Sequence, residues 1–371
     1  MRDEIAELAA WQRADVEFAL ATVVSTSRSA PRPAGSVLAL HPDGRVLGNV
    51  SGGCVEPAVV GIAQQVLRDG AAQRARFGFS DDEALAVGLT CGGEIDVLVR
   101  RVSPDHFPFA RLADAVARDA PAVVATVIGT QADDRLLGAT LVVTDAGAFG
   151  SLSGTDVGRV LAEECDSMLG RGEVTTRHIG AGGERMQEEL TVLIQPFVER
   201  PRLLVFGAID YAAAVATVGR FLGYQVTVCD ARAVFATPER FPDADEVVVE
   251  WPHRHLERAE LDERSVIVVL THDAKFDVPA ILAALRTPAR YIGVMGSRRT
   301  HADRLERLRA EGADEDDLAR LRSPIGLDLG ARSPQETAIS IAAEIVMTEH
   351  STTGRPLRDV DGPIHPPSSR G

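Results

Sequence analysis

The chain has 371 residues, of which 45% are hydrophobic and 25% are charged. At about 150 residues per domain, this length predicts two or three domains. The formal net charge of −15 argues against a nucleic-acid-binding protein, because such proteins gather Lys and Arg where they meet the phosphates. The apolar runs are shorter than the roughly 18 residues that span a membrane, so we expect no membrane partner.

The four cysteines are scattered along the chain, at Cys54, Cys91, Cys165 and Cys229. No Cys-x-x-Cys pair is present in the sequence, so neither a zinc ribbon nor an iron–sulfur cluster is indicated. Isolated cysteines in so long a chain are also not typical of a disulfide scaffold. Because the N-terminus is acidic and lacks an apolar signal core, we expect a protein of the reducing cytoplasm.

The most informative segment is Ser51-Gly52-Gly53-Cys54-Val55-Glu56-Pro57, which joins a strand-like run to a helical run. Two consecutive glycines let a backbone approach a ligand closely. A helix start lowers the pKa of a thiol and attracts anions. The pattern therefore predicts that Cys54 contacts a ligand. The alternative is a small core residue, since unpaired cysteines are among the most buried residue types.

The first half of the chain is predicted to be an internal duplication. Residues 21–24 and 94–99 resemble residues 125–128 and 189–194, at an offset of about 100 residues, and a fixed offset marks repeated supersecondary units. Each copy is expected to form a strand, a hairpin, a helix and a later strand.

The two predicted copies differ in chemistry. Gly53 and Cys54 of the first copy correspond to Thr155 and Asp156 of the second. The first copy also has Cys91-Gly92-Gly93 before its late strand, where the second has Met186-Gln187-Glu188. The repeat therefore supplies a scaffold, and its first copy carries the thiols and glycine pairs expected of a binding site.

Residues 196–201 are predicted to be a linker, after which strand and helix patterns alternate, as in a parallel, doubly wound sheet. We therefore expect an α/β protein with a mixed α+β domain over residues 1–198 and a Rossmann-like domain over residues 199–350. The predicted strands are 202–206, 225–229, 246–250, 266–270 and 291–295, and the predicted helices are 211–222, 276–285 and 300–310.

The last predicted helix has a clear start signal. Ser333 is an N-cap candidate, Pro334 suits the first helical position, and Glu336 completes a capping box. Residues 351–371 are rich in Pro, Gly, Ser and Thr, and this composition predicts a disordered tail.

The turn after the first strand of the second half carries half of a dinucleotide-binding fingerprint. Gly207 and Ala212 fit its first and sixth positions, and Asp230 follows where a ribose-binding carboxylate is expected. Ile209 does not fit, because its branched side chain stands where a pyrophosphate approaches the backbone. Asp210, next to it, directly precedes the predicted helix. A turn that merely packs the helix against the sheet is the alternative.

Polar residues also follow two later strands, where ligands of open α/β sheets bind. His272 and Asp273 follow one of these strands, and a hydrogen-bonded core histidine is the alternative there. Gly296-Ser297-Arg298-Arg299 follows the next and precedes a helix, which predicts a phosphate site. A solvated helix start is the alternative for the two arginines.

These motifs together resemble the XdhC/CoxI family, the accessory proteins that mature molybdenum-containing hydroxylases such as xanthine dehydrogenase. The resemblance covers nearly the whole chain. It departs from the family at the first turn of the second half, where Gly207-Ala208-Ile209-Asp210 stands in place of Gly-Ala-Gly-His. The residues that carry it are Pro31-Arg32, Gly35, Gly48, 51–56, Cys91-Gly92-Gly93, Thr271-His272-Asp273, 291–299 and 324–332.

The resemblance implies a protein that binds the molybdenum cofactor, as molybdopterin or its dinucleotide form, holds it during sulfuration and delivers it to an apo-hydroxylase. A cysteine desulfurase is a further implied partner, and we expect a homodimer, because twofold assemblies are the commonest. Thiolate is a soft ligand suited to molybdenum in a sulfur environment, so Cys54 is the candidate metal ligand or the guard of a labile sulfur. The cofactor is expected between the two domains. The residues expected to bind it are Gly52, Gly53, Cys54, Glu56, Cys91, Gly92, Gly93, Gly207, Asp210, Asp230, His272, Asp273, Gly296, Ser297, Arg298 and Arg299.

Two other functions stay open from the sequence. An NAD(P)-dependent oxidoreductase would use Gly207, Ala212 and Asp230, although Ile209 weakens NAD(P) binding. An adaptor protein that has lost ligand binding would need none of these residues. We expect a maturation factor that binds a cofactor rather than an enzyme that turns over a substrate.

Overall fold

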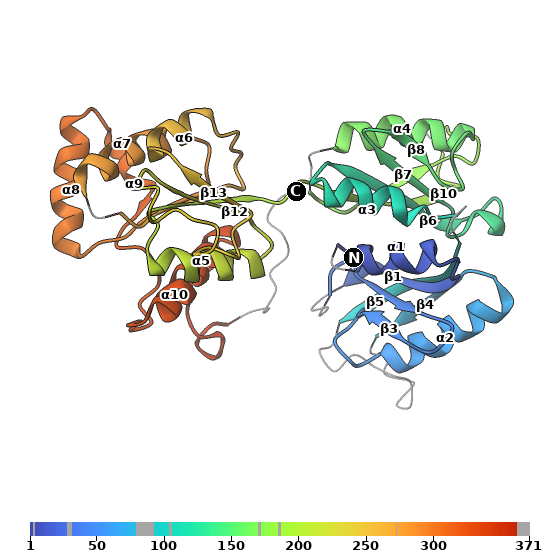
Figure 1. The fold of residues 1–371 in the computed structure, drawn as a ribbon. Coiled ribbons are helices and arrows are strands. Elements are labelled where there is room, and N and C mark those ends of the chain that lie inside the picture. The colour runs from blue at the N-terminus through green and yellow to red at the C-terminus, as the bar shows by residue number, and fades with distance from the viewer. Residues whose placement is uncertain are drawn as a thin grey trace. The chain divides into compact units, whose positions relative to one another are not determined.

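A computed structural model describes residues 1–2, 4–27, 32–78, 93–103, 106–169, 172–184, 187–271 and 273–361. The chain divides into two compact units, Met1–Glu199 and Arg200–Asp361 (Figure 1). Among the helices of the described ranges, none is long and apolar enough to cross a membrane.

The N-terminal unit contains two five-stranded sheets with the same strand order. One sheet runs β3-β2-β1-β5-β4 and the other β8-β7-β6-β10-β9, with antiparallel pairing of their neighbouring strands. The first is built from β1 (Phe18–Ser27), β2 (Val37–Leu40), β3 (Val46–Gly48), β4 (Gln73–Phe77) and β5 (Glu94–Val102). The second is built from β6 (Ala122–Thr130), β7 (Thr140–Thr144), β8 (Gly147–Phe149), β9 (Thr175–Ile179) and β10 (Leu190–Phe197).

The shared strand order shows that the two predicted copies have the same topology. Among the described residues, one helix packs on the sheet of each copy, α2 (Glu56–Asp69) in the first and α4 (Asp156–Met168) in the second. The helices bury equivalent positions at helical spacing, and each buried aliphatic side chain contributes about 1.5–3 kcal/mol to folding. These positions are Val55, Val59, Ala63 and Val66 in the first copy, and Val157, Leu161, Cys165 and Met168 in the second.

A shared core joins the two copies. α1 (Ile5–Arg13) and α3 (Phe109–Ala117) lie between the sheets (Figure 1). Their apolar faces pack with side chains from the inner faces of β1, β2, β6 and β7. The two copies therefore bury surface against each other and form a single unit. The short 3₁₀ helix η1 (Asp134–Leu136) lies in the loop between β6 and β7.

The C-terminal unit is a six-stranded sheet in the order β13-β12-β11-β14-β15-β16. It is parallel, as predicted, and β16 is added to the five predicted strands. From β11 the chain adds β12 and β13 on one side of the sheet, and then β14, β15 and β16 on the other. The strand order therefore reverses between β11 and β14, and ligands of open α/β sheets bind at such a point. Its strands are β11 (Arg202–Phe206), β12 (Gln225–Asp230), β13 (Glu246–Val249), β14 (Val266–Val269), β15 (Tyr291–Val294) and β16 (Leu321–Arg322).

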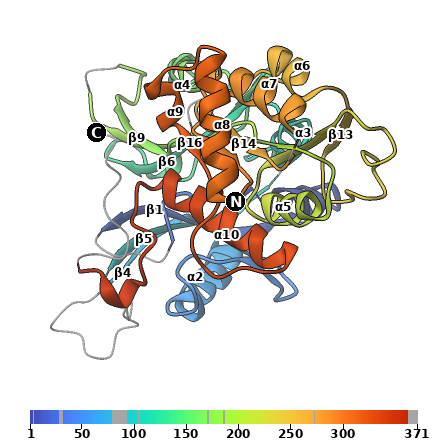
Figure 2. The same cartoon turned by 90° about the vertical axis from the view of Figure 1, so that its left-hand side faces the viewer.

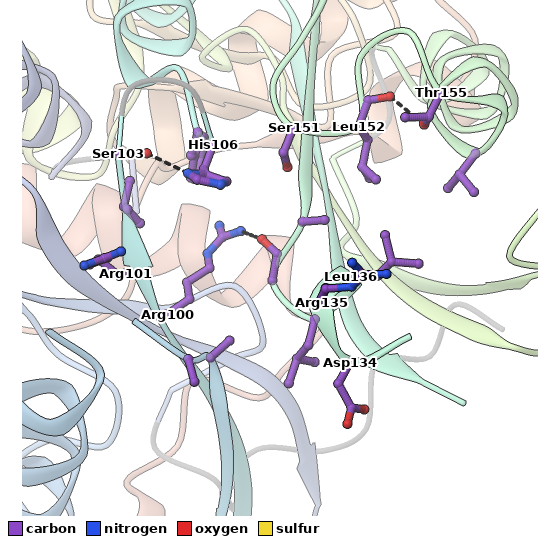
Figure 3. A pocket seen from close by; sticks show the side chains of 18 of the residues that line it. Arg100, Arg101, Ser103, His106, Asp134, Arg135, Leu136, Ser151, Leu152 and Thr155 are labelled. Atoms are coloured by element: carbon purple, nitrogen blue, oxygen red, sulfur yellow. Dashed lines mark hydrogen bonds between the residues drawn. The ribbon is translucent and has the colours of Figure 1, made fainter. Parts of the chain in front are cut away.

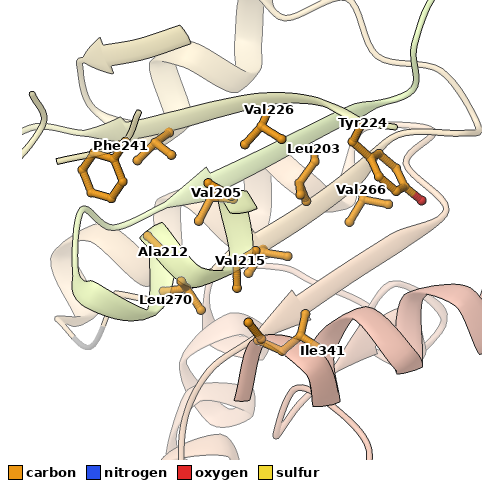
Figure 4. Close-up of a cluster of buried hydrophobic side chains, with 14 of the residues drawn as sticks. Leu203, Val205, Ala212, Val215, Tyr224, Val226, Phe241, Val266, Leu270 and Ile341 are labelled. Carbon is orange, nitrogen blue, oxygen red and sulfur yellow. The ribbon is translucent and has the colours of Figure 1, made fainter. Parts of the chain in front are cut away.

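Helices cover both faces of this sheet. α5 and α10 lie side by side on one face, while α6 and α7 lie together on the other with α8 (Figures 1 and 2). Figure 4 shows the first face, where strand residues such as Val205 and Val226 meet Val215 of α5 and Ile341 of α10. The helices are α5 (Asp210–Phe221), α6 (Pro252–Arg258), α7 (Ala274–Leu285), α8 (Arg298–Ala310), α9 (Glu315–Ala319) and α10 (Pro334–Glu349).

Two local predictions have different outcomes. The start of α10 is confirmed, because Ser333 accepts from the Glu336 N–H and the Glu336 carboxylate accepts in return. The linker begins later than predicted, because Pro196 and Phe197 belong to β10. Pro196 pairs with Val123 of β6 and lies beyond the residues of β10 that pair with β9. The N–H that proline lacks is therefore not needed for a hydrogen bond to β9. After α10 the described chain contains the short 3₁₀ helix η2 (Leu357–Asp359).

Candidate functional site

The turn between β3 and α2 depends on two glycines. The φ angles of Gly52 and Gly53 are 99° and 117°, in a region that residues with a Cβ rarely adopt. A Cβ built at either position would meet nothing within 4 Å. The glycines are therefore needed for the backbone conformation, and the space beside the turn is open.

The Glu56 carboxylate organises this turn from inside. It accepts hydrogen bonds from the N–H groups of Ser51 at 2.8 Å, Gly52 at 3.1 Å and Gly53 at 2.9 Å. The N–H of Val50 and the hydroxyl of Ser51 donate to it as well, at 3.2 Å and 2.6 Å. The turn is wrapped around a carboxylate, as an anion is held by a nest of backbone N–H groups.

These hydrogen bonds decide the ionisation of Glu56. Burial raises the pKa of the Glu56 carboxyl, but the bonds from the Ser51 hydroxyl and from the backbone N–H groups outweigh burial and lower the pKa to about 2. Glu56 is therefore a carboxylate at neutral pH whose oxygens are already occupied. We assign it to positioning the turn rather than to contacting a ligand.

Asn49 supports the same turn and was not predicted from the sequence. Its side-chain oxygen accepts from the N–H groups of Ser51 at 3.0 Å and Gly52 at 2.5 Å, as in an Asx turn. The Ser51 hydroxyl accepts from the Val55 N–H at 3.2 Å. An Asn two residues before Ser-Gly is the sequence signal that could have identified it.

Cys54 differs from the other described thiols in its exposure. It is half-buried beside the core of its own copy, whereas Cys165 and Cys229 have no exposed surface. Burial raises the pKa of each of these two thiols to about 12, which makes them poor nucleophiles and ligands. Cys91 and Gly92 lie outside the described residues, and Gly93 is buried directly before β5.

The second copy begins its helix in a different way. The Thr155 side chain accepts from the N–H of Gly158 at 3.0 Å, an ordinary N-cap. Gly158 stands where the first copy has Glu56, and a Cβ there would lie 1.9 Å from the Leu152 carbonyl oxygen. No carboxylate can enter this turn, so the Glu56-centred arrangement belongs to the first copy alone.

In the C-terminal unit, the predicted ribose carboxylate is engaged within the protein. Asp230, 3% exposed, accepts from the N–H of Ala208 at 2.8 Å and from the guanidinium of Arg232 at 2.7 Å. Burial raises the pKa of Asp230, but the hydrogen bonds from Arg232 and Ala208 outweigh burial and hold the pKa below its ordinary value. Asp210 is exposed, 3.5 Å from the Arg240 guanidinium. The Asp230 carboxylate thus fixes the Gly207 turn.

The other predicted residues start helices at the same sheet edge. Asp273 caps α7 by accepting from the Lys275 N–H at 3.1 Å, and Ser297 caps α8 by accepting from Thr300 at 3.1 Å. Arg298 and Arg299 are exposed and form no ion pair with a described residue. They follow Gly296 at the end of β15 and so stand at a helix N-terminus, where anions are favoured.

The predicted residues fall into two groups. The Gly207 turn meets the loop after β14, because a Cβ on Gly207 would lie 3.0 Å from Thr271 Cγ2. His272, in that loop, lies outside the described residues. The turn of Cys54 belongs to the other unit. Within the described ranges, no three His, Cys, Asp or Glu side chains gather as a metal site.

Comparison with known proteins identifies the family. A family model of the XdhC Rossmann domain matches residues 203–345, and the model of the XdhC and CoxI family matches residues 11–78 and 115–180. The latter two segments fall in the two copies of the duplication.

Curated relatives extend the match over most of the chain. A probable xanthine dehydrogenase subunit from Bacillus subtilis is 27% identical over 90% of this chain and 93% of its own length. The molybdenum cofactor insertion chaperone PaoD of Escherichia coli is 24% identical over 88% of this chain and 81% of its own. A crystal structure of a xanthine dehydrogenase from Bacillus halodurans has the same fold, with a TM-score of 0.71 and 24% identity over 94% of this chain and 96% of that chain. The chain belongs to the XdhC/CoxI family.

Proposed function

We propose that this protein is a maturation factor that binds the molybdenum cofactor as cargo and delivers it to a hydroxylase of the xanthine dehydrogenase or carbon monoxide dehydrogenase type. The names of two relatives support this role, since one is described as part of a probable xanthine dehydrogenase and the other as a molybdenum cofactor insertion chaperone.

The proposal rests on the position of Cys54 in the turn directly before α2. Glu56 and Asn49 hold the turn so that a thiol stands at the helix start beside open space. The cargo brings its own dithiolene sulfur ligands, so one protein thiolate is sufficient to hold it. A soft thiolate suits a soft metal centre. Cys54 acts as that ligand or protects the labile sulfur next to it.

The phosphate of the pterin needs a separate contact. The exposed Arg298 and Arg299 at the start of α8 supply cationic, bidentate donors for such a group. The Gly207 turn supplies backbone at a helix start, although the Ala208 N–H is taken by Asp230. Because Asp230 is also paired with Arg232, its carboxylate is not open to a ribose, and no observation favours an NAD(P)-dependent oxidoreductase.

Cofactor retention tests the proposal. The Cys54→Ala variant, produced in a molybdenum-replete host, should copurify with less than about a tenth of the pterin and molybdenum bound by the wild type. Cys165→Ala is the matched control, because Ala63 fills the equivalent core position of the first copy, and it should keep the wild-type amount. Equal molybdenum in Cys54→Ala and the wild type would exclude the role of this thiol.

Delivery is tested separately. Wild-type protein loaded with cofactor should restore activity to an apo-hydroxylase of the same host, and the Cys54→Ala variant should not. If loaded wild-type protein leaves every such apoenzyme inactive, the chain stores the cofactor without delivering it.

A further inference from the structure

The N-terminal unit contains a second candidate site, away from the Cys54 turn. A cavity of about 1240 Å³ is lined by the end of β5, by η1 and the loop after it, and by the start of α4 (Figure 3). It therefore lies where the first copy meets the second. Its volume is sufficient for a molecule the size of a nucleotide.

Arg100, on β5, is the unusual residue of this cavity. It is 6% exposed, and its guanidinium donates to the Gly138 carbonyl and the Thr140 hydroxyl. No carboxylate of the described residues pairs with it, and its Nε is buried without a hydrogen-bond partner. Burial lowers the pKa of Arg100 to about 9. The ring of Phe107 lies against the guanidinium, with Arg100 Cζ 5.1 Å from the ring centroid. The charge nevertheless has no counter-ion among the described residues, and a buried charge without a counter-ion costs folding free energy.

The duplication shows that this charge is not needed for the fold. By strand register, Arg100 pairs with Leu20 as Gln195 pairs with Val124, so Gln195 is its equivalent in the second copy. Gln195 donates to the Gly35 carbonyl at 3.1 Å, just as Arg100 donates to that of Gly138. A neutral amide therefore makes the same link between the copies, and the guanidinium of Arg100 needs another explanation.

The groups around Arg100 suit an oxyanion. α4 begins at the cavity. Thr155 accepts from the Gly158 N–H, and the N–H groups of Asp156 and Val157 have no partner within the helix. The other two arginines of the lining are already paired: Arg101 lies 3.7 Å from Glu17, which also lines the cavity, and Arg135 is paired with Asp133 outside it. Asp134 and Asp156 also line the cavity, as does His106, whose Nδ1 is 2.6 Å from the Ser103 hydroxyl.

We propose that this cavity binds a phosphate-bearing small molecule, with the phosphate held between the Arg100 guanidinium and the N-terminus of α4. Arg100 and the helix start come from different copies, so the bound anion bridges the two halves of the N-terminal unit. The helix start of the second copy corresponds to the Cys54 turn of the first, since Gly154, Thr155 and Asp156 of the cavity are the counterparts of Gly52, Gly53 and Cys54. The duplication thus provides two sites, of which one presents a thiol and the other a cation.

Calorimetric titration of the full-length chain tests this proposal, with inorganic phosphate and adenosine 5′-monophosphate as separate probes at low ionic strength. The wild type should bind phosphate saturably, and Arg100→Gln should bind it at least tenfold more weakly. The matched control is Arg118→Gln, which neutralises an exposed arginine paired with Asp145 outside the cavity, and it should bind as the wild type does. Tighter binding of the nucleotide than of phosphate would identify a larger ligand, and equal binding a free oxyanion.

Thermal unfolding distinguishes this role from a structural one. Without phosphate, Arg100→Gln should melt at or above the wild-type temperature, because the amide keeps the link and removes the buried charge. The rise in melting temperature that phosphate gives the wild type should be lost in Arg100→Gln and partly retained in Arg100→Lys. The proposal is overturned if the wild type does not bind phosphate, or if Arg100→Gln binds it unchanged. Neither result bears on Cys54, because no molybdenum cofactor is involved.

Discussion

The two copies of the N-terminal unit start their helices differently on the same scaffold. In the second copy, Thr155 caps α4 with one hydrogen bond, and Gly158 lets the turn close on the Leu152 carbonyl. In the first copy, the Glu56 carboxylate enters that space and gathers the backbone N–H groups of two positive-φ glycines. The comparison teaches that the fold needs only a capped helix, and that the extra carboxylate serves to present Cys54.

The largest expected difference is in thiol reactivity. In a Cys91→Ser background, Cys54 should react with iodoacetamide at pH 8 at least ~100-fold faster than Cys165 and Cys229, because buried thiols of raised pKa expose little thiolate. Mass spectrometry of the alkylated peptides with time measures the three rates. Cys54 lies in the turn before α2, and Cys165 lies in α4. Comparable rates for these two thiols would show that the turn of the first copy does not make its thiol accessible.

The carboxylate at the centre of the turn gives the next largest effect. Glu56→Gln should lower the free energy of unfolding by about 2 kcal/mol, since bonds to a charged acceptor are lost and an amide NH₂ faces the backbone N–H groups. Thr155→Ala, the corresponding change in the second copy, should cost about 1 kcal/mol. Urea unfolding of both variants compares the two turns, and equal costs would contradict the special role of Glu56.

The dependence on pH isolates the charge of Glu56. Its pKa is about 2 in the folded protein and 4.5 as the ordinary value, so its ionised form favours the folded state. This contribution is complete above pH 4.5 and is lost as pH falls toward 2. The stability difference between the wild type and Glu56→Gln should therefore be constant from pH 7 to 5 and shrink below pH 4.5. A difference that grew on acidification would mean that the carboxylate is strained rather than stabilised.

The sequence predicted those features that depend on local pattern. The parallel strands of the C-terminal unit read as short apolar runs, and the Ser333 capping box lies within four residues. The strand β4 was missed, because its sequence Gln-Arg-Ala-Arg-Phe carries charges that suit an edge strand. The role of Glu56 was also missed, because its carboxylate turns back on its own turn instead of facing a ligand.

Long-range contacts were beyond reach from the sequence. Gly35 and Gly138 begin similar segments of the two copies, Gly-Ser-Val-Leu and Gly-Ala-Thr-Leu. The side chains that donate to their carbonyls, Gln195 and Arg100, are of different types and lie on strands distant in the sequence. The repeat of residues 94–99 in 189–194, extended by one residue, pairs Arg100 with Gln195, and the strand registers agree. The bond that each side chain makes to the other copy could not be predicted from this alignment. A site that depends on the meeting of two copies therefore appears only once the copies are packed together.

The smallest expected effect concerns the glycines of the two turns. Gly53→Ala should cost about 1–2 kcal/mol, because a φ of 117° is unfavourable for alanine while no atom lies within 4 Å of the new methyl group. Gly154→Ala, at a φ of 77° and with the same open surroundings, should cost less, since that angle is closer to the left-handed helical region. Urea unfolding measures both costs, and molybdenum content measures whether the strain reaches the site.

Because the turn of the first copy positions the thiol, Gly53→Ala should also reduce cofactor retention, whereas Gly154→Ala should leave it unchanged. If both variants retain the same amount of cofactor, the conformation of the Gly52-Gly53 turn is not what presents Cys54.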